Sequence, residues 1–323
     1  MKKTLLMVAV AAVCSMAQAK ILRVNNTTGS GAPYTKIDDA LTAAEIGDTI
    51  MVDGSKSTYG NIIISKKTVL MGPGYWRSEN GVSGQGESDA TLGTITINAA
   101  AQGTVLRGLN MEYIKINASN VVVNRCHVEK DVSVQAGVSS IADNCIIHQN
   151  FIGGYVRGYS NNSYANYTQI TNNIFSYPGG PLVDNINQGY IAYNTFASAR
   201  QLDRDTNVGS HISGCTIEKN ICVGGEYSIE GNVFKDNYFS GYVFSSIYNS
   251  NAYSFDGTDL TIKNTELSEE DAAAIEGKGA FNGDDPYVIS GIPAGPVIQD
   301  VTVPASVEQG NNLNITIKLG VQK

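Results

Sequence analysis

The sequence has little of the residues that define several large classes of protein. Charged residues make up 16% of the 323 residues and prolines number 8, which excludes a coiled coil, a disordered tail, collagen and a proline-rich stalk. Five cysteines in so long a chain exclude a small disulfide-stabilised domain. Basic residues are also scarce, with 22 Lys and Arg against 30 Asp and Glu. We therefore expect no nucleic-acid partner.

Residues 1–19 have the pattern of an export signal. A basic start at Lys2-Lys3 precedes an apolar stretch at 5–13, and Ala17-Gln18-Ala19 forms a small-residue cleavage site. Neither this stretch nor a later one has the roughly 20 apolar residues that a membrane-spanning helix needs. Cleavage before Lys20 changes the formal net charge from -8 to -10 because it removes two lysines. We expect an exported protein that is periplasmic, cell-surface or secreted, with no membrane span.

The cysteines do not have the spacing of a metal site, because the chain lacks a Cys-x-x-Cys pair and a His pair at finger spacing. The four that remain after cleavage are Cys126, Cys145, Cys215 and Cys222. Either they are reduced thiols that fill a core, or they form one or two disulfides, which export permits. Cys14 leaves open a lipoprotein, with the lipid on that sulfur.

An internal repeat, written aliphatic-x-x-Asn-x-apolar, organises the middle of the chain. Its copies centre on Asn124, Asn144, Asn173, Asn194 and Asn220, with a further copy at Asn232 or Asn237. We prefer Asn237, because the 12 residues from Asn220 to Asn232 are too few for a three-sided coil. The two apolar positions of each copy point to opposite faces of a straight strand. They reach one core only if the chain bends between them, so each copy predicts a strand, a corner at Asn and a strand.

Short β-rich runs such as Thr49–Val52 and Ile62–Ile64 surround the repeat, and they lack helical apolar periodicity. Many short strands are also typical of a β-sandwich, but stacking of equivalent residues favours a solenoid. We predict an all-β fold in which the asparagines stack into a ladder and Cys126 lies one rung from Cys145.

Helix signals lie near both ends. Thr35 and Asp38 form a capping box before a helix at the N-terminal end, and a second helix is expected before Gly277. Alternating apolar residues in 297–303 and 313–319 predict two further strands. The predicted organisation is a signal peptide at 1–19, a β-helix domain with an N-terminal capping helix at 20–286, and a C-terminal β-arm or cap at 287–323.

The chain resembles the right-handed parallel β-helix proteins of the pectin-lyase-like superfamily over about residues 20–281. The likeness rests on the helix at 34–44 followed by Gly47-Asp48-Thr49-Ile50-Met51-Val52, on Thr104-Val105-Leu106-Arg107-Gly108-Leu109, and on the Asn-centred corners. The closing Tyr287-Val288-Ile289-Ser290-Gly291-Ile292-Pro293 is similar to the end of short exported β-helix proteins of uncertain function. The resemblance implies a right-handed coil. It does not fix an activity, because the superfamily includes polysaccharide lyases, glycoside hydrolases, esterases, epimerases and non-catalytic adhesins.

Three long loops, at 148–168, 176–188 and 197–211, are expected to stack on one flank of the coil. Tyr rings pack on sugar rings, and Arg and Asp bond hydroxyl and carboxylate groups. The flank therefore predicts a polysaccharide or cell-surface glycan as partner, and an ordinary solvated loop surface is the alternative. The candidate binding residues are Arg157, Tyr159, Tyr164, Tyr167, Tyr177, Asp184, Arg200 and Arg204.

No reaction is identifiable from motifs. A lyase needs a cation beside the uronate and a base for the C5 proton, and a hydrolase needs two carboxylates about 5 to 9 Å apart. The candidate catalytic residues are Arg200, Arg204, His211 and Asp184, but the signature segments of lyases and hydrolases of this fold are missing. The favoured function is therefore glycan binding without catalysis. A polysaccharide lyase or glycoside hydrolase acting on acidic glycans at the same flank is the alternative, and a purely structural surface protein is a third.

A calcium loop is suggested by oxygen ligands at alternate positions, Asp203, Asp205 and Asn207, followed by Gly209. That glycine is one position later than in the EF-hand pattern and no bidentate Glu follows, so a charged turn is the alternative. No other cofactor is expected. The sequence contains no signal for the oligomeric state.

Overall fold

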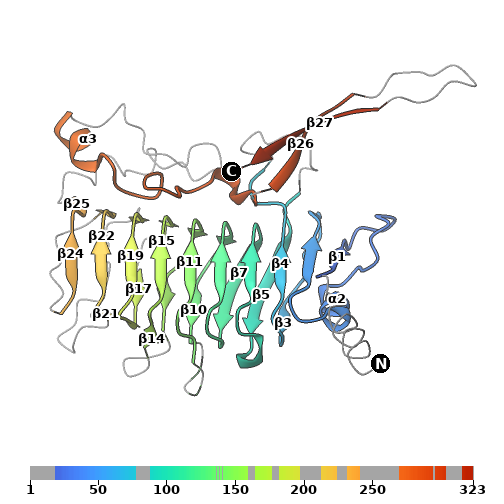
Figure 1. The fold of residues 1–323 in the computed structure, drawn as a ribbon, viewed down its shortest axis with the longest axis horizontal. Helices are drawn as coiled ribbons and strands as arrows, with labels where there is room; N and C mark the ends of the chain where they lie inside the picture. The colour runs from blue at the N-terminus through green and yellow to red at the C-terminus, as the bar shows by residue number, and fades with distance from the viewer. Residues whose placement is uncertain are drawn as a thin grey trace, which may run out of the picture.

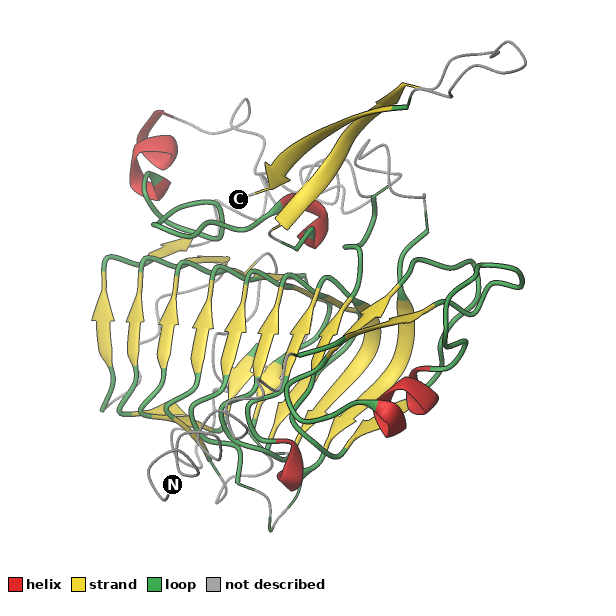
Figure 2. Cartoon of the chain, turned by 45° about the vertical axis from the view of Figure 1, so that its right-hand side comes forward, coloured by secondary structure: helices red, strands yellow, loops and turns green. Residues whose placement is uncertain are grey.

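The protein is described by a computed structural model that covers residues 19–77, 88–135, 137, 139, 141–158, 164–176, 182–196, 212–223, 231–240, 269–293, 295–302 and 315–322. These residues form an all-β fold of long parallel sheets with few helices, a parallel β-solenoid, as the sequence predicts (Figures 1 and 2).

The strands of the described residues form two long sheets and two small ones. The ten-stranded sheet consists of β1 (Ile21–Val24), β2 (Thr49–Val52), β4 (Val69–Met71), β6 (Val105–Arg107), β8 (Val122–Asn124), β11 (Ile146–His148), β15 (Gln169–Thr171), β19 (Tyr190–Ala192), β22 (Thr216–Glu218) and β24 (Val233–Lys235). The twelve-stranded sheet consists of β3 (Ile62–Ile64), β5 (Thr91–Ile97), β7 (Asn110–Ile116), β9 (His127–Val128), β10 (Val132–Val134), β12 (Phe151–Ile152), β13 (Val156–Arg157), β16 (Ile174–Phe175), β17 (Val183–Asp184), β20 (Thr195–Phe196), β23 (Ile221–Val223) and β25 (Tyr238–Ser240).

The three-stranded sheet consists of β14 (Ala165–Asn166), β18 (Ile186–Asn187) and β21 (Ile212–Ser213). The predicted C-terminal strands are present as β26 (Gly295–Thr302) and β27 (Thr316–Gln322), which pair antiparallel. The helices are α2 (Ile37–Ala43), α3 (Glu269–Ile275) and two 3-10 turns, η1 (Ala99–Ala101) and η4 (Ile289–Gly291).

Neighbouring strands in the long sheets come from successive coils of the chain. Val123 of β8, for example, pairs in parallel with Ile147 of β11, and Ile147 pairs with Ile170 of β15. A parallel pair needs a long crossover connection, and here the rest of each coil, with its strands in the other sheets, supplies that connection. The coil therefore explains the many short strands without intervening helices.

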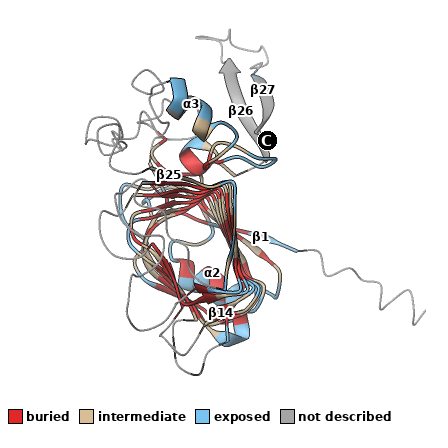
Figure 3. Ribbon diagram, turned by 90° about the vertical axis from the view of Figure 1, so that its left-hand side faces the viewer, coloured by how far each residue is buried: buried red, intermediate tan, exposed pale blue. Residues whose placement is uncertain are grey.

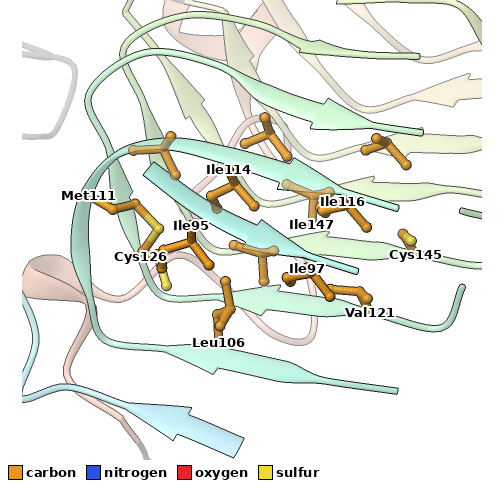
Figure 4. Close-up of a cluster of buried hydrophobic side chains, with 14 of the residues drawn as sticks. Ile95, Ile97, Leu106, Met111, Ile114, Ile116, Val121, Cys126, Cys145 and Ile147 are labelled. Carbon is orange, nitrogen blue, oxygen red and sulfur yellow. The ribbon is translucent and has the colours of Figure 1, made fainter. Parts of the chain in front are cut away.

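The core lies inside the coil, where buried side chains of the strands point inward (Figures 3 and 4). In the ten-stranded sheet these residues are Ile50, Leu70, Leu106, Val123, Ile147, Ile170, Ile191 and Ile217, all at 0% exposure. Ile95 and Ile114 of the twelve-stranded sheet pack into the same cluster. Burial of one such side chain contributes about 1.5–3 kcal/mol, so stacking of equivalent residues holds the coils together.

Both predicted helices are present, but the first lacks the predicted capping box. The helix α2 begins at Ile37 after Lys36, and no side chain caps its first turn. Its buried residues Ile37, Ala40 and Leu41 face the core instead, so burial rather than capping holds it at the first coil. The helix α3 is followed by Gly277 with φ 72°, as its stop signal indicates.

A ladder of asparagines, buried except for the partly buried last one, lies at the corner between the ten-stranded and twelve-stranded sheets. Its members are Asn150, Asn173, Asn194, Asn220 and Asn237. In the middle of the ladder, Asn173 Oδ1 accepts bonds from the backbone N–H of Asn150 at 2.9 Å and from Asn150 Nδ2 at 3.0 Å. Its own Nδ2 donates to the Ile147 carbonyl at 2.8 Å and to Asn194 Oδ1 at 3.0 Å. The preferred last copy, centred on Asn237, is thus confirmed.

Asn124 and Asn144 lie outside this ladder, so the predicted register of the first two copies is wrong. Asn124 ends β8 and pairs in register with His148, and the ladder position of its coil is held by Cys126, whose N–H donates to Asn150 Oδ1 at 2.9 Å. Asn144 precedes β11 and lies at the corner where the chain enters the ten-stranded sheet. Cys126 and Cys145 therefore occupy different corners rather than adjacent rungs. All four described cysteines are buried, and none of them forms a disulfide.

The residue before each ladder asparagine makes the bend in the chain. Gln149, Asn172, Tyr193 and Lys219 have φ of 56°, 54°, 54° and 53°. These residues adopt the left-handed conformation that turns the chain. The ladder asparagines instead satisfy buried backbone groups at the corner.

Residues 276–293, here called the strap, run back along the stack from α3 towards β26 (Figure 1). The N–H of Gly279 donates to the Lys219 carbonyl at 2.9 Å, and Asn172 Nδ2 donates to the Asn282 carbonyl at 2.8 Å. A Cβ on Gly279 would lie 2.6 Å from Cδ1 of Ile221, so this position requires glycine. The strap therefore packs tightly on the bends of the later coils.

The strap continues over earlier coils and covers a second apolar cluster. Gln149 Nε2 donates to Asp285 Oδ1 at 2.8 Å, and Arg125 Nη1 donates to the Ile292 carbonyl at 2.9 Å. Beneath it lie the buried residues Tyr75, Phe151 and Ile174. The strap adds its own Ala280 and Tyr287 to this cluster, and Trp76 packs against it. The only tryptophan of the chain is thus held between the coil and the strap.

Candidate functional site

Polar and aromatic side chains project from the part of the twelve-stranded sheet formed by β7, β10, β13 and β17. We call this surface the Arg157 face. Its residues are Glu112, Tyr113, Lys115, Lys130, Asp131, Ser133, Tyr155, Arg157 and Asp184. They point outward because their neighbours in the strands, such as Val132, Val134 and Val156, are fully buried and successive side chains of a strand alternate between faces.

The strand register brings four of these residues into one row. Lys115 pairs with Ser133, Ser133 with Arg157, and Arg157 with Asp184. Neighbouring strands are about 4.8 Å apart, so the row presents a cation, a hydroxyl and a second cation at regular intervals and ends at the buried carboxylate of Asp184. The rigid sheet fixes these intervals before a ligand arrives.

Arg157 is held at the centre of the face by two contacts. Its guanidinium carbon lies 4.4 Å from the centre of the Tyr155 ring, and Nη2 lies 3.7 Å from Asp131 Oδ2. Its side chain is 44% exposed, against 15% for Asp131. The planar guanidinium is therefore oriented by an aromatic ring and a carboxylate and still presents N–H groups to solvent.

Asp131 is the half-buried carboxylate of the face. Burial raises the pKa of its carboxyl above the ordinary 3.8, against smaller opposing effects from the Tyr155 N–H and from the charge of Arg157. The Tyr155 N–H donates to Asp131 Oδ1 at 3.4 Å. A carboxyl whose pKa is raised and that lies next to a cation is a candidate for acid–base chemistry.

A second aromatic and cation pair borders the first. Lys130 Nζ lies 4.9 Å from the centre of the Tyr113 ring and 2.6 Å from Glu112 Oε1. The bond with Glu112 raises the pKa of Lys130, so this amine is positively charged at neutral pH. Lys115 is exposed, and none of the carboxylates in the described part of the chain pairs with it. The face thus offers one unpaired cation and two tyrosines.

The structure brings together some of the predicted site residues. Arg157 and Asp184 lie on adjacent strands of the Arg157 face, and Asp184 is 7% exposed. Tyr164 and Tyr167 lie beside β14 of the three-stranded sheet, and Tyr167 is 52% exposed at the bend before β15. The remaining predicted binding, catalytic and calcium residues lie outside the described residues: Tyr159, Tyr177, Arg200, Asp203, Arg204, Asp205, Asn207 and His211.

The sequence-based prediction omits the parts of the face that lie on strands rather than in long loops. Asp131, Tyr113 and Lys115 are examples, because the predicted binding residues come from long loops and not from the short β-rich runs. The sequence signal for these residues is the alternation of polar and apolar positions. Asp131 lies beside Val132, and Tyr113 and Lys115 lie on either side of Ile114, so the odd-numbered residues face solvent.

Two general features of the described residues bear on function. No cluster of three or more His, Cys, Asp or Glu in them is placed to hold a metal ion. None of their helices is long and apolar enough to span a bilayer.

A comparison with protein-family models and one with curated proteins gave no match. Among solved structures, the chain is similar to a crystal structure of Escherichia coli YbhC with 11% sequence identity, and the alignment covers 70% of this chain and 86% of that one. The TM-score is 0.35, and a likeness at this level carries no argument about function.

Proposed function

We propose that the chain is an exported, right-handed parallel β-helix protein, similar to the pectin-lyase-like superfamily, that binds a polysaccharide at the Arg157 face. Export rests on the signal-like residues 1–19, and the likeness rests on the sequence segments at the first coils. The ordered row of Lys115, Ser133 and Arg157 on a rigid parallel sheet carries the binding proposal.

The chemistry of the face suits sugars that carry carboxylate groups. Arg157 offers a guanidinium with a fixed plane, which matches a carboxylate in a bidentate arrangement. Lys115 adds a second charge on a strand two rungs away, about 10 Å by the strand spacing. Tyr113 and Tyr155 supply aromatic surface beside both cations. We propose uronic-acid polysaccharides as the class of ligand.

Electrophoresis in gels that contain a uronic-acid polysaccharide or a neutral one tests this proposal. We expect the acidic gel to retard the wild-type protein, and Arg157→Gln to weaken binding about tenfold because a charge-assisted bond is lost. Arg23→Gln is the matched control, since Arg23 is exposed, pairs with Asp53 at 2.6 Å and lies on the ten-stranded sheet. Equal retardation of the two variants would remove the Arg157 face from the binding site.

A second candidate function, turnover of the glycan at the same face, is favoured by Asp131. Its carboxyl has a raised pKa beside Arg157, as a group that transfers protons to or from a sugar requires. An assay of new reducing ends and of unsaturated products detects hydrolysis and elimination separately. Turnover that Asp131→Asn abolishes while binding persists would establish an enzyme, and binding without turnover would establish the binding protein.

A further inference from the structure

Arg107 is a cation of the ten-stranded sheet, whereas the Arg157 row lies on the twelve-stranded sheet. It ends β6 and points outward from the ten-stranded sheet, between Met71 and Asn124 in register. Its Nε is shielded from solvent and makes no hydrogen bond. Among the described residues, no carboxylate pairs with it. A shielded N–H without an acceptor is rare in folded proteins and calls for an explanation.

A second guanidinium lies at the next coil. Arg125 is 6% exposed, and its bonds to Gln149 Oε1 at 2.8 Å and to the Ile292 carbonyl at 2.9 Å fix its position under the strap. Arg107 and Arg125 are close enough that the charge of Arg107 lowers the pKa of Arg125, although burial is the larger cause. Two arginines thus converge where the strap meets the ten-stranded sheet.

Asp285 is the carboxylate that the described residues bring to this corner, and it is already engaged. Asp285 Oδ2 lies 2.9 Å from His148 Nε2, and Asp285 Oδ1 accepts a bond from Gln149 Nε2 at 2.8 Å. The Gln149 amide and the Ile292 carbonyl, which bind Arg125, are neutral and do not offset its charge. The corner therefore carries more positive than negative charge, in a protein whose formal net charge is -8. Such an excess attracts a small anion from solution.

We propose that Arg107 and Arg125 form an anion-binding site for a carboxylate or sulfate group at this corner. The anion lies on the outward side of β6 and β8 and accepts bonds from the guanidinium of Arg107 and from an N–H of Arg125. Nε of Arg107 is shielded in the structure, so the Arg107 side chain has to turn for its Nε–Nη edge to reach the anion. The planar fork of Arg107 matches the two oxygens of either group. The group comes either from a free anion or from an acidic sugar. This site is independent of the polysaccharide site proposed at the Arg157 face.

Titration calorimetry with sodium sulfate, against sodium chloride at matched ionic strength, tests the site. We expect one saturable site for sulfate in the wild-type protein and about tenfold or weaker binding in Arg107→Gln, because a charge-assisted pair of bonds is lost. Arg107→Lys keeps the charge without the fork and is expected to bind with intermediate affinity. Arg23→Gln is the matched control, since Arg23 occupies the equivalent outward position of β1 and is already paired with Asp53.

The outcomes separate this proposal from the polysaccharide site. Arg157→Gln keeps Arg107 and Arg125, so a sulfate site that survives in this variant and is lost in Arg107→Gln lies at this corner, and failure at one site does not count against the other. Titration with monomeric glucuronate and with a uronic-acid polysaccharide then identifies the source of the group. Circular dichroism and the melting temperature show that Arg107→Gln is folded. The proposal is overturned if the wild type shows no saturable sulfate binding, or if Arg107→Gln and Arg23→Gln bind sulfate equally.

Discussion

Replacement of a ladder asparagine gives a sharp test of the coil. Asn173 is fully buried, and its side chain makes four hydrogen bonds to three neighbours. Asn173→Ala leaves the N–H of Asn150 without its acceptor and removes the donor to the Ile147 carbonyl. Each buried group left unsatisfied costs about 1–3 kcal/mol, so we expect the free energy of unfolding to fall by about 2–5 kcal/mol.

Asn124 is the matched control, because the repeat pattern treats it as equivalent and the structure does not. It is partly buried and donates to the His148 carbonyl at 3.2 Å and to Gln149 Oε1 at 3.1 Å. Both acceptors keep a second donor from Arg125, through its N–H and its Nε. No buried group is left unsatisfied, so we expect Asn124→Ala to cost about 1 kcal/mol or less.

Equilibrium unfolding in urea, followed by far-ultraviolet circular dichroism, compares the two variants with the wild type. The linear dependence on urea gives each free energy, and an unchanged slope shows that the same surface unfolds in each. The reasoning would be refuted if both variants lost the same stability, or if Asn173→Ala lost less than about 1 kcal/mol.

Three further predictions concern the carboxyl, the thiols and the strap. Because burial raises the pKa of Asp131, the folded protein binds the carboxyl proton more tightly than the unfolded chain does. The stability of the wild type relative to Asp131→Asn should therefore rise as the pH falls from neutral through the acid range. Parallel pH profiles of the two proteins would contradict this. Burial raises the pKa of the Cys126 thiol to about 12, and the other described cysteines are buried as well. These cysteines should therefore not react with a thiol reagent at pH 8 until urea unfolds the protein. Rapid labelling of the native state would refute their burial. Asn172→Ala removes two hydrogen bonds to the strap. Limited proteolysis should therefore cut residues 276–288 faster than in the wild type. Unchanged cleavage would show that these hydrogen bonds do not hold the strap.

The fold could be predicted from the sequence because one physical constraint repeats in every coil. Aliphatic residues at equivalent positions stack inside, and the asparagines at Asn173, Asn194 and Asn220 mark the corner. The register of the earliest copies could not be predicted. Asn124 and Asn144 match the same pattern, but Cys126 holds the ladder position of that coil and Asn150 continues the ladder. A local pattern does not distinguish two corners of one coil that both favour asparagine.

The candidate site was predicted only in part, because pairing across coils is a long-range property. Arg157 and Asp184 belong to segments that the sequence predicts to stack, and they lie on adjacent strands. Asp131 lies in the preceding coil, and its contact with Arg157 depends on the register of β10 and β13. The contact between Arg125 and the strap joins residues far apart in the chain, and no spacing rule connects them.

Hydroxyl-radical footprinting with a bound uronic-acid oligosaccharide tests the central claim most directly. We predict that the oligosaccharide protects Tyr113 and Tyr155 of the Arg157 face from oxidation. Tyr190, which lies on the ten-stranded sheet and bonds Glu218 at 2.6 Å, should be oxidised equally with and without ligand. Protection of Tyr190 without protection of Tyr155 would contradict the account and place the ligand on another side of the coil.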